Sequence, residues 1–230
     1  MAEGLTVTLT RAGPLAVDVA FVVPPGQTLA LVGPSGAGKS TVLKAIAGLV
    51  PATGCVRVGA HRWQDGSTGM PAWRRRAGLV LQGGALFPHL DALGNVMIAQ
   101  ARPDRAAALA LLAAMQMDGA TARRRPAQLS GGEQMRAALA RALARAPDVL
   151  LLDEPFAAVD PPVRRALLAL VAQVRRQSGA PMVIVTHDLA EAAGIADLAA
   201  FIDGGRIAEQ GPAAAVLADP ASCLNQWLRD

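Results

Sequence analysis

The segment between residues 33 and 40 constrains the fold of this chain more than any other. It follows the pattern G-x-x-x-x-G-K-S and lies between an apolar, β-branched segment, Thr28–Val32, and a helical pattern at residues 39–48. A strand, a glycine-rich loop and a helix in this order are typical of a phosphate-binding loop, or P-loop. Its glycines let backbone N–H groups face a phosphate, and the helix N-terminus adds partial positive charge.

The side chains of this loop predict specific contacts with a nucleotide. Lys39 is suited to reach the outer phosphates, and the hydroxyl of Ser40 is suited to coordinate Mg²⁺. Thr41 can donate a hydrogen bond to an inner phosphate. A glycine-rich turn without a ligand is the alternative, and the flanking strand and helix argue against it. The predicted nucleotide-binding residues are Gly33, Pro34, Ser35, Gly36, Ala37, Gly38, Lys39, Ser40 and Thr41.

A second apolar segment, residues 149–152, is followed by Asp153 and Glu154. Ligand sites of open α/β sheets lie at the C-terminal ends of their strands, so both carboxylates are expected beside the nucleotide. Asp153 is suited to hold Mg²⁺, directly or through water, and Glu154 is suited to orient and polarise the attacking water. An acidic pair after a strand can also be a surface turn, but the P-loop upstream favours the functional interpretation.

Alternation of strand and helix patterns predicts an α/β core with a parallel sheet. A chain of 230 residues is long enough for one large domain. The stretch at about residues 88–146 is Ala-rich and mostly helical in pattern, so we expect it to be a helical subdomain inserted into the core. The core then comprises about residues 1–87 and 147–230. Further strand patterns lie at residues 5–9, 17–23, 55–58, 78–81, 182–186, 198–202 and 206–209.

Composition and local sequence argue against several classes of protein. The longest apolar run, residues 106–115, is half of the roughly 20 residues that a membrane-spanning helix needs. Residues 1–4 contain neither the basic region nor the apolar core of a secretory signal. Cys55 and Cys223 have no metal-binding or redox spacing. Together these features predict a cytoplasmic location.

The net charge of +4 raises the question of nucleic-acid binding. The basic runs at residues 74–76 and 123–125 are short, and no aromatic residue interleaves with them, as stacking on single strands requires. An Arg-rich, solvated surface, facing a membrane or a membrane protein, is therefore the better interpretation. We expect no nucleic-acid partner.

A third motif, LSGGE at residues 129–133, lies between the P-loop and the acidic strand end. With the P-loop, LSGGE and LLLDEP at residues 150–155 in this order, the chain resembles the ATP-binding subunits of ABC transporters over nearly its whole length. The resemblance implies a P-loop NTPase fold with a mixed, mostly parallel sheet core, an N-terminal antiparallel β subdomain and an inserted helical subdomain. It also implies ATP as substrate and Mg²⁺ as cofactor.

Further residues match motifs of that family. Gln82 is similar to the glutamine that links Mg²⁺ and the water to the membrane subunit. Residues 157–160 are similar to the D-loop between paired subunits, and His187 is similar to the switch histidine that contacts the γ-phosphate. The resemblance implies catalytic roles for Lys39, Gln82, Glu154 and His187, and Mg²⁺ ligation by Ser40, Gln82 and Asp153.

The same resemblance gives the LSGGE motif a role in a dimer. In the family, this motif lies at a helix N-terminus and caps the γ-phosphate of an ATP that the partner subunit holds. The residues that correspond here are Ser130, Gly131 and Gly132. Two ATP molecules are therefore expected between two copies of the chain, and hydrolysis is expected to require the dimer.

Loop residues suggest which kind of transporter the subunit serves. Residues 86–90, LFPHL, and 94–96, GNV, are similar to importer subunits for oxyanions, sugars, polyamines and iron. Three segments are similar to the molybdate branch: residues 56–59, which overlap the strand pattern at 55–58, and residues 63–66 and 71–76, which we expect to lie in loops. We therefore expect an importer of molybdate or a related oxyanion, with iron, sulfate, polyamine or sugar as alternatives.

An importer subunit implies several partners and a location. These are a second copy of the chain, transmembrane permease subunits and, indirectly, a periplasmic binding protein, at the cytoplasmic face of the bacterial inner membrane. A non-transport ABC ATPase of DNA repair or translation is less favoured, because long coiled-coil insertions and a second cassette are absent from the sequence. A regulatory partner with an impaired site is disfavoured by the intact Gln82, Glu154 and His187.

The sequence departs from the family pattern in a few places. It contains no Tyr, and the aromatic position that stacks on adenine in the family falls near Thr10 or Arg11, so adenine is expected to meet the Arg11 side chain or a weaker partner. Met135 replaces a common Gln, and Ala157 replaces a common Ser. The chain ends at Asp230, which predicts no C-terminal regulatory domain.

Overall fold

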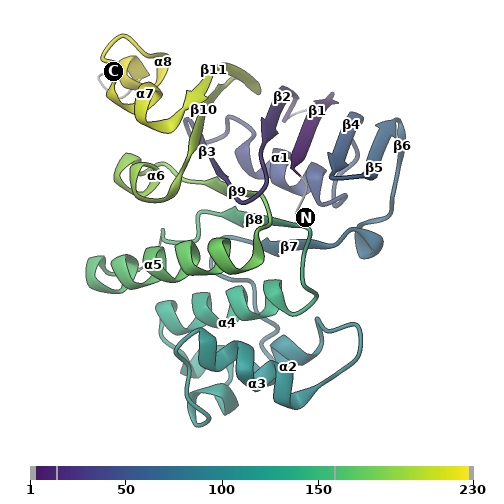
Figure 1. The fold of residues 1–230 in the computed structure, drawn as a ribbon, viewed down its shortest axis with the longest axis vertical. Coiled ribbons are helices and arrows are strands. Elements are labelled where there is room, and N and C mark those ends of the chain that lie inside the picture. The colour runs from purple at the N-terminus through teal and green to yellow at the C-terminus, as the bar shows by residue number, and fades with distance from the viewer. Residues whose placement is uncertain (1–3, 14, 158, 228–230) are drawn as a thin grey trace.

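A computed structural model describes residues 4–13, 15–157 and 159–227. Their strands form one mixed sheet in the order β6-β5-β4-β1-β2-β11-β10-β3-β9-β8-β7 (Figure 1). Strands β10, β3, β9, β8 and β7 run parallel, whereas β1, β2, β4, β5 and β6 pair antiparallel. The predicted fold class is confirmed. The strands are β1 (Leu5–Arg11), β2 (Val17–Val23), β3 (Thr28–Val32), β4 (Thr53–Val58), β5 (His61–Gly66), β6 (Thr68–Gly69), β7 (Ala77–Val80), β8 (Val149–Asp153), β9 (Met182–Val185), β10 (Leu198–Asp203) and β11 (Arg206–Pro212).

The helices lie in separate groups around this sheet. Helices α2, α3 and α4 pack on one another at the end of the molecule away from β1 and β2 (Figure 1). Within the described residues, no helix combines the length and apolar character that crossing a bilayer takes. The helices are α1 (Lys39–Ile46), α2 (Ala92–Met97), α3 (Arg105–Ala114), α4 (Gly131–Leu143), α5 (Pro161–Ser178), α6 (Leu189–Ile195), α7 (Ala213–Ala218) and α8 (Cys223–Trp227), with 3₁₀ turns at Ala72–Arg74, Thr121–Arg123 and Pro126–Gln128.

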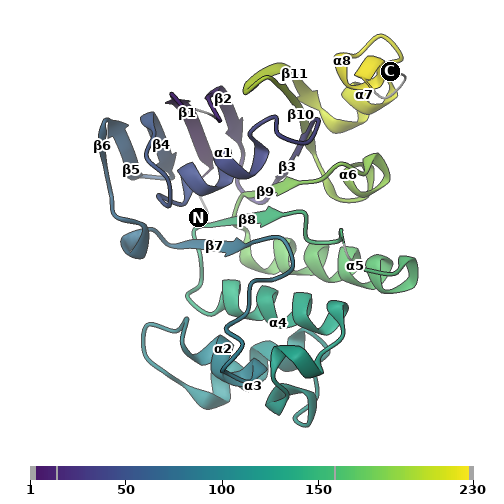
Figure 2. The same cartoon turned by 180° about the vertical axis from the view of Figure 1, so that it is seen from behind.

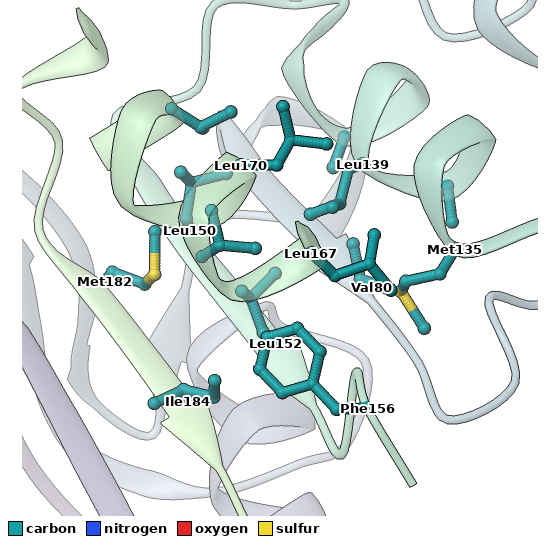
Figure 3. Close-up of a cluster of buried hydrophobic side chains, with 14 of the residues drawn as sticks. Val80, Met135, Leu139, Leu150, Leu152, Phe156, Leu167, Leu170, Met182 and Ile184 are labelled. Carbon is teal, nitrogen blue, oxygen red and sulfur yellow. The ribbon is translucent and has the colours of Figure 1, made fainter. Parts of the chain in front are cut away.

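The central strands are buried on both faces, which explains why their sequences are almost continuously apolar. All five residues of β8 are buried, and alternate ones face opposite layers. Leu150 and Leu152 pack with α4 and α5, whereas Leu151 packs with α1 and the antiparallel strands. Figure 3 shows the first of these layers, and Figure 2 shows α1 in front of the sheet on the other side. The two layers hold the carboxyl end of β8 in a fixed position.

Two segments differ from the sequence-based expectations. Residues 63–66, expected in a loop, belong to β5, which pairs antiparallel with β4 and buries Trp63 to 2% exposure. This strand, HRWQDG, contains no β-branched residue, so its pattern does not predict a strand. The basic run at residues 74–76, expected to be solvated, contains the buried Arg75, which is 4% exposed.

Arg75 is buried because its guanidinium donates hydrogen bonds to several backbone carbonyls and to one side-chain oxygen. Its Nη1 donates to the carbonyls of Ala45 and Ile46, at 3.1 and 2.7 Å. Its Nε donates to Met70 O at 2.8 Å, and its Nη2 donates to Gln64 Oε1 at 2.9 Å. Ala45 and Ile46 lie at the C-terminal end of α1, where a cation also interacts favourably with the helix dipole. Arg75 therefore anchors the helix that begins at the P-loop, although burial lowers the pKa of its guanidinium.

Candidate nucleotide-binding site

The loop between β3 and α1 has a backbone that requires glycine. Gly38 precedes α1 with φ 94°, and a Cβ there would lie 2.7 Å from Val17 Cγ1. Gly33 has φ 159°, and a Cβ there would lie 2.1 Å from the carbonyl oxygen of Ile202. Other residues are disfavoured at both positions by backbone conformation and by space. The loop therefore lies close to β2 and β10, with the first turn of α1 open at its N-terminus.

Lys39 is the first residue of α1 and is only 6% exposed. Its Nζ donates hydrogen bonds to the carbonyl oxygens of Gly33 and Pro34, both at 2.8 Å. Burial lowers the pKa of Lys39, while the nearby Glu154 and Asp153 act in the opposite direction. A buried ammonium held by uncharged carbonyls has an unmet demand for negative charge, which phosphate oxygens can meet.

Ser40 and Asp153 form the next part of the site. Ser40 Oγ donates to Asp153 Oδ1 at 2.9 Å, and Asp153 is 5% exposed. Burial raises the pKa of Asp153, against the opposing effects of the Ser40 hydrogen bond and of two lysines. Mg²⁺ prefers oxygen ligands and is usually bound by one or two carboxylates together with phosphate and water oxygens. A hydroxyl beside a carboxylate at the P-loop fits this requirement.

Glu154 lies between Gln82 and His187. Gln82 Nε2 donates to Glu154 Oε2 at 3.1 Å, and His187 Nδ1 lies 3.7 Å from Glu154 Oε1. The three residues follow β8, β7 and β9, which are neighbours in the sheet, so their side chains converge at its carboxyl edge. The structure thus brings together residues from three distant parts of the sequence.

The backbone of Glu154 has an unusual conformation. Its φ is 46°, in the left-handed region, which costs a residue with a Cβ about 1–2 kcal/mol. The Glu154 N–H donates to Val185 O at 3.0 Å, which ties the end of β8 to β9. Phe156, which is fully buried, anchors the chain just beyond (Figure 3). Strained residues of this kind concentrate at functional sites.

The residues Ser130, Gly131 and Gly132 lie apart from this cluster, at the start of α4. Ser130 caps α4: its Oγ accepts a hydrogen bond from Glu133 N at 3.3 Å. Glu133 Oε2 accepts from Ser130 N at 2.7 Å and from Ser130 Oγ at 2.8 Å, and these bonds lower the pKa of Glu133. In the described part of the chain, no hydrogen bond joins Ser130–Gly132 to the P-loop. The hydrogen bonds of Ser130 are thus made within its own helix, to Glu133.

The remaining predictions at the site are tested only in part. Arg11, expected near adenine, donates its Nη1 to Leu15 O at 2.8 Å, and its contact with adenine stays a prediction. Ala158 of the predicted D-loop lies outside the described residues.

A polar cluster next to His187 was missed from the sequence. It consists of Arg164, Thr186, Asp188 and Glu191. The position of Asp188 just before a helical pattern is a local N-cap signal. No local signal in the sequence predicts that Asp188 pairs with Arg164, because α5 and α6 meet only in the folded chain.

Comparison with known proteins gives one family. The sequence profile of the family described as ABC transporter matches residues 17–157. The Fe(3+) ions import ATP-binding protein FbpC 2 of Rhodococcus jostii (strain RHA1) is 45% identical over 205 residues, which cover 88% of this chain and 59% of that protein. The molybdenum import ATP-binding protein ModC of Mycobacterium tuberculosis (strain CDC 1551 / Oshkosh) is 42% identical over 219 residues, with 90% and 59% coverage. The chain thus spans 59% of the length of these curated relatives.

A solved structure extends the similarity to three dimensions. The dimeric structure of a post-hydrolysis state of the ATP-binding cassette MJ0796, bound to ADP and Pi, superimposes with a TM-score of 0.77 at 27% sequence identity. The match covers 92% of this chain and 99% of that chain.

Proposed function

Since this chain belongs to the ABC transporter family, we propose that it is an ATPase that powers the import of a solute across a membrane. The observation that carries the proposal is the Glu154 carboxylate, which lies between Gln82 and His187 at the same sheet edge as the Ser40–Asp153 pair. The P-loop that bears Ser40 supplies the phosphate-binding groups beside them. These are the parts that hydrolysis of a nucleoside triphosphate requires.

The reaction is in-line attack of water on the γ-phosphate. Lys39 and the N-terminal N–H groups of α1 bind phosphate oxygens, and His187 contacts the γ-phosphate. Glu154 accepts a hydrogen bond from the attacking water and orients it, with Gln82 fixing the carboxylate. Ser40, Asp153 and Gln82 would hold Mg²⁺, which would supply positive charge to the phosphates. Catalysis then depends mainly on positioning and on charge stabilisation.

The complete site requires a second copy of the chain. Ser130, Gly131 and Gly132 begin α4, and the N-terminus of a helix binds anions through its open N–H groups. In the folded monomer these residues are not bonded to the P-loop, so they are available to the ATP of a partner subunit. The dimeric state given for the related cassette supports this arrangement.

Exposed aromatic residues supply a surface for permease subunits. Trp73 is 73% exposed and Phe87 is 43% exposed. Two arginines contact them, one on α4 and one just after it: the Arg141 guanidinium lies 5.7 Å from the centre of the Phe87 ring, and Arg145 Nη1 donates to Trp73 O at 3.3 Å. Since Phe87 follows Gln82 closely, a membrane partner bound here would contact the segment that reaches the catalytic carboxylate. We propose on this basis that the chain works at the cytoplasmic face of the bacterial inner membrane.

Two cargoes are supported by different observations. The sequence between residues 56 and 96 favours molybdate or a related oxyanion, and a 42% identical relative is named as a molybdenum importer subunit. Iron is the second candidate, because a 45% identical relative is named as an Fe(3+) importer subunit. The solute is selected by the periplasmic binding protein and the permease. On the sequence of this chain we propose molybdate as the cargo and keep iron as the alternative.

The proposal is tested with the purified chain and its Lys39→Ala variant. We expect MgATP hydrolysis by the wild type and loss of nucleotide affinity in the variant, because the phosphates lose their buried cation. Equal ATP binding by both proteins would contradict the P-loop assignment. In cells that lack the native subunit, molybdate uptake should return with the wild type and not with Lys39→Ala. Restored iron uptake instead would select the alternative cargo.

A further inference from the structure

Four polar side chains form a closed cluster beside His187. Arg164 of α5 donates its Nη1 to Asp188 Oδ2 at 2.9 Å, and the same nitrogen lies 3.5 Å from Glu191 Oε1. Thr186 Oγ1 donates to Glu191 Oε2 at 2.5 Å and accepts from the backbone N–H of Asp188 at 3.0 Å. Thr186 is 1% exposed and Glu191 is 5% exposed. The buried Glu191 carboxylate needs these partners, because a buried charge left alone would be costly.

The cluster determines where His187 lies. The His187 imidazole is 60% exposed, so packing does not position it. Its two neighbours in the sequence, Thr186 and Asp188, are both members of the cluster. Asp188 also caps α6 through Oδ1, which accepts from the backbone N–H groups of Ala190 and Glu191. The backbone on both sides of the histidine is thus fixed, and the ring is held 3.7 Å from the Glu154 carboxylate.

Arg164 also reaches the segment that follows Glu154. Its Nη2 donates to Val159 O at 3.4 Å, and its side chain is 30% exposed. One guanidinium therefore contacts both chain segments that leave the carboxyl edge of the sheet, one after β8 and one after β9.

We propose that Arg164 is a positioning residue for ATP hydrolysis, which joins the His187 segment to the segment after Glu154 and so sets the distance between these two side chains. The inference rests on the proposed ATPase function. It assigns Arg164 no contact with the nucleotide. Its loss should therefore lower kcat while leaving the KM for MgATP nearly unchanged.

The test compares Arg164→Gln with Arg165→Gln in the purified full chain. Arg165 is the adjacent, exposed arginine, and it makes no hydrogen bond or ion pair with any residue that the structure describes. We expect kcat to fall by about tenfold to 100-fold in Arg164→Gln, since a misplacement of about 1 Å at a catalytic group can cost about 100-fold. Arg165→Gln should match the wild type. Equal kcat in the two variants would overturn the inference and leave the ATPase function standing.

A second measurement does not depend on activity. The chain contains three histidines, so the His187 ring signal can be assigned by NMR from its absence in His187→Ala. We expect Arg164→Gln to shift or broaden this signal and to leave those of His61 and His89 unchanged. An unchanged His187 signal would overturn the inference.

A third variant covers failure of Arg164→Gln to fold. Asp188→Asn retains a side chain that caps helices well and removes the charge pair with Arg164. Lowered kcat at unchanged KM in this variant supports the inference, and wild-type kinetics contradict it. Absence of hydrolysis by the wild type would overturn the proposed function itself.

Discussion

Ser40 Oγ donates a hydrogen bond to Asp153 Oδ1 over 2.9 Å, which joins two residues 113 positions apart in the chain. The bond connects the first turn of α1 to the carboxyl end of β8. It therefore places the phosphate-binding loop and the acidic pair in one site.

Glu154→Gln should separate nucleotide binding from hydrolysis. The amide keeps the size of the carboxylate and can still interact with Gln82, but it cannot polarise water as a carboxylate does. We expect ATP binding and ATP-dependent dimerisation to persist, and the rate of phosphate release to fall by about 100-fold or more. Filter binding, light scattering and a phosphate assay measure the three properties. Phosphate release near the wild-type rate would show that another group performs this role.

The left-handed backbone at Glu154 predicts an unusual order of stability. With φ at 46°, glycine should be preferred over alanine at this position. We expect Glu154→Gly to be more stable to urea than Glu154→Ala by about 0.5–1 kcal/mol. At Ala169, an exposed helical position in α5, the order should reverse: Ala169→Gly should lose about 0.5–1 kcal/mol. The same preference for alanine at both sites would contradict the backbone assignment.

Complementation between variants tests the shared site. Lys39→Ala and Ser130→Ala should each be nearly inactive, because every site in a homodimer lacks one group. A mixed dimer of the two variants contains one site with both Lys39 and Ser130 intact. We therefore expect an equimolar mixture to hydrolyse ATP faster than either variant alone. If dimers shown to be mixed hydrolyse ATP no faster than either variant alone, Ser130 acts in the same site as the Lys39 of its own subunit.

Arg75 should contribute strongly to stability although it lies in a basic run. Arg75→Met removes the side-chain donor from the carbonyls of Ile46 and Met70, and leaves Ala45 O with only the Gly48 N–H. We expect the free energy of unfolding to fall by about 2–4 kcal/mol. The exposed neighbour provides the control, and Arg74→Met should change stability by less than about 0.5 kcal/mol. Equal effects in urea denaturation would mean that Arg75 is solvated.

Glu191 and Glu133 predict opposite dependences of stability on pH. Burial raises the pKa of Glu191 above its ordinary value of 4.5, so its stabilising contribution is present below that value and is lost as pH rises through the folded pKa. The free energy of unfolding of Glu191→Gln relative to wild type should therefore increase from about pH 4 to about pH 7.

Hydrogen bonds from Ser130 lower the pKa of Glu133, so its contribution is present above 4.5 and is lost as pH falls through the folded pKa. Glu133→Gln should accordingly lose stability relative to wild type over the same rise in pH. Urea titrations at several pH values measure both variants. Slopes of the same sign would contradict one of the two assignments.

The sequence by itself determined the local parts of this protein. The P-loop was predictable because its glycines, its preceding apolar strand and its helix are adjacent in the chain and act through the backbone. The strand β8 was predictable because burial on both faces leaves a continuous apolar run, and its position fixed the expectation for Asp153 and Glu154. The resemblance to a known family then added Gln82, His187 and the LSGGE motif, which local chemistry does not single out.

The tertiary structure decided how distant residues pair. Arg75 and Arg74 are indistinguishable in the sequence, yet only Arg75 meets the carbonyl end of α1 and is buried. Arg164 and Arg165 are likewise adjacent, and only Arg164 faces the His187 segment. Residues in β5 form a strand because β4 offers them an edge rather than because their own pattern predicts one. In each case the deciding partner lies elsewhere in the chain, and its energy of interaction exists only after the sheet has assembled.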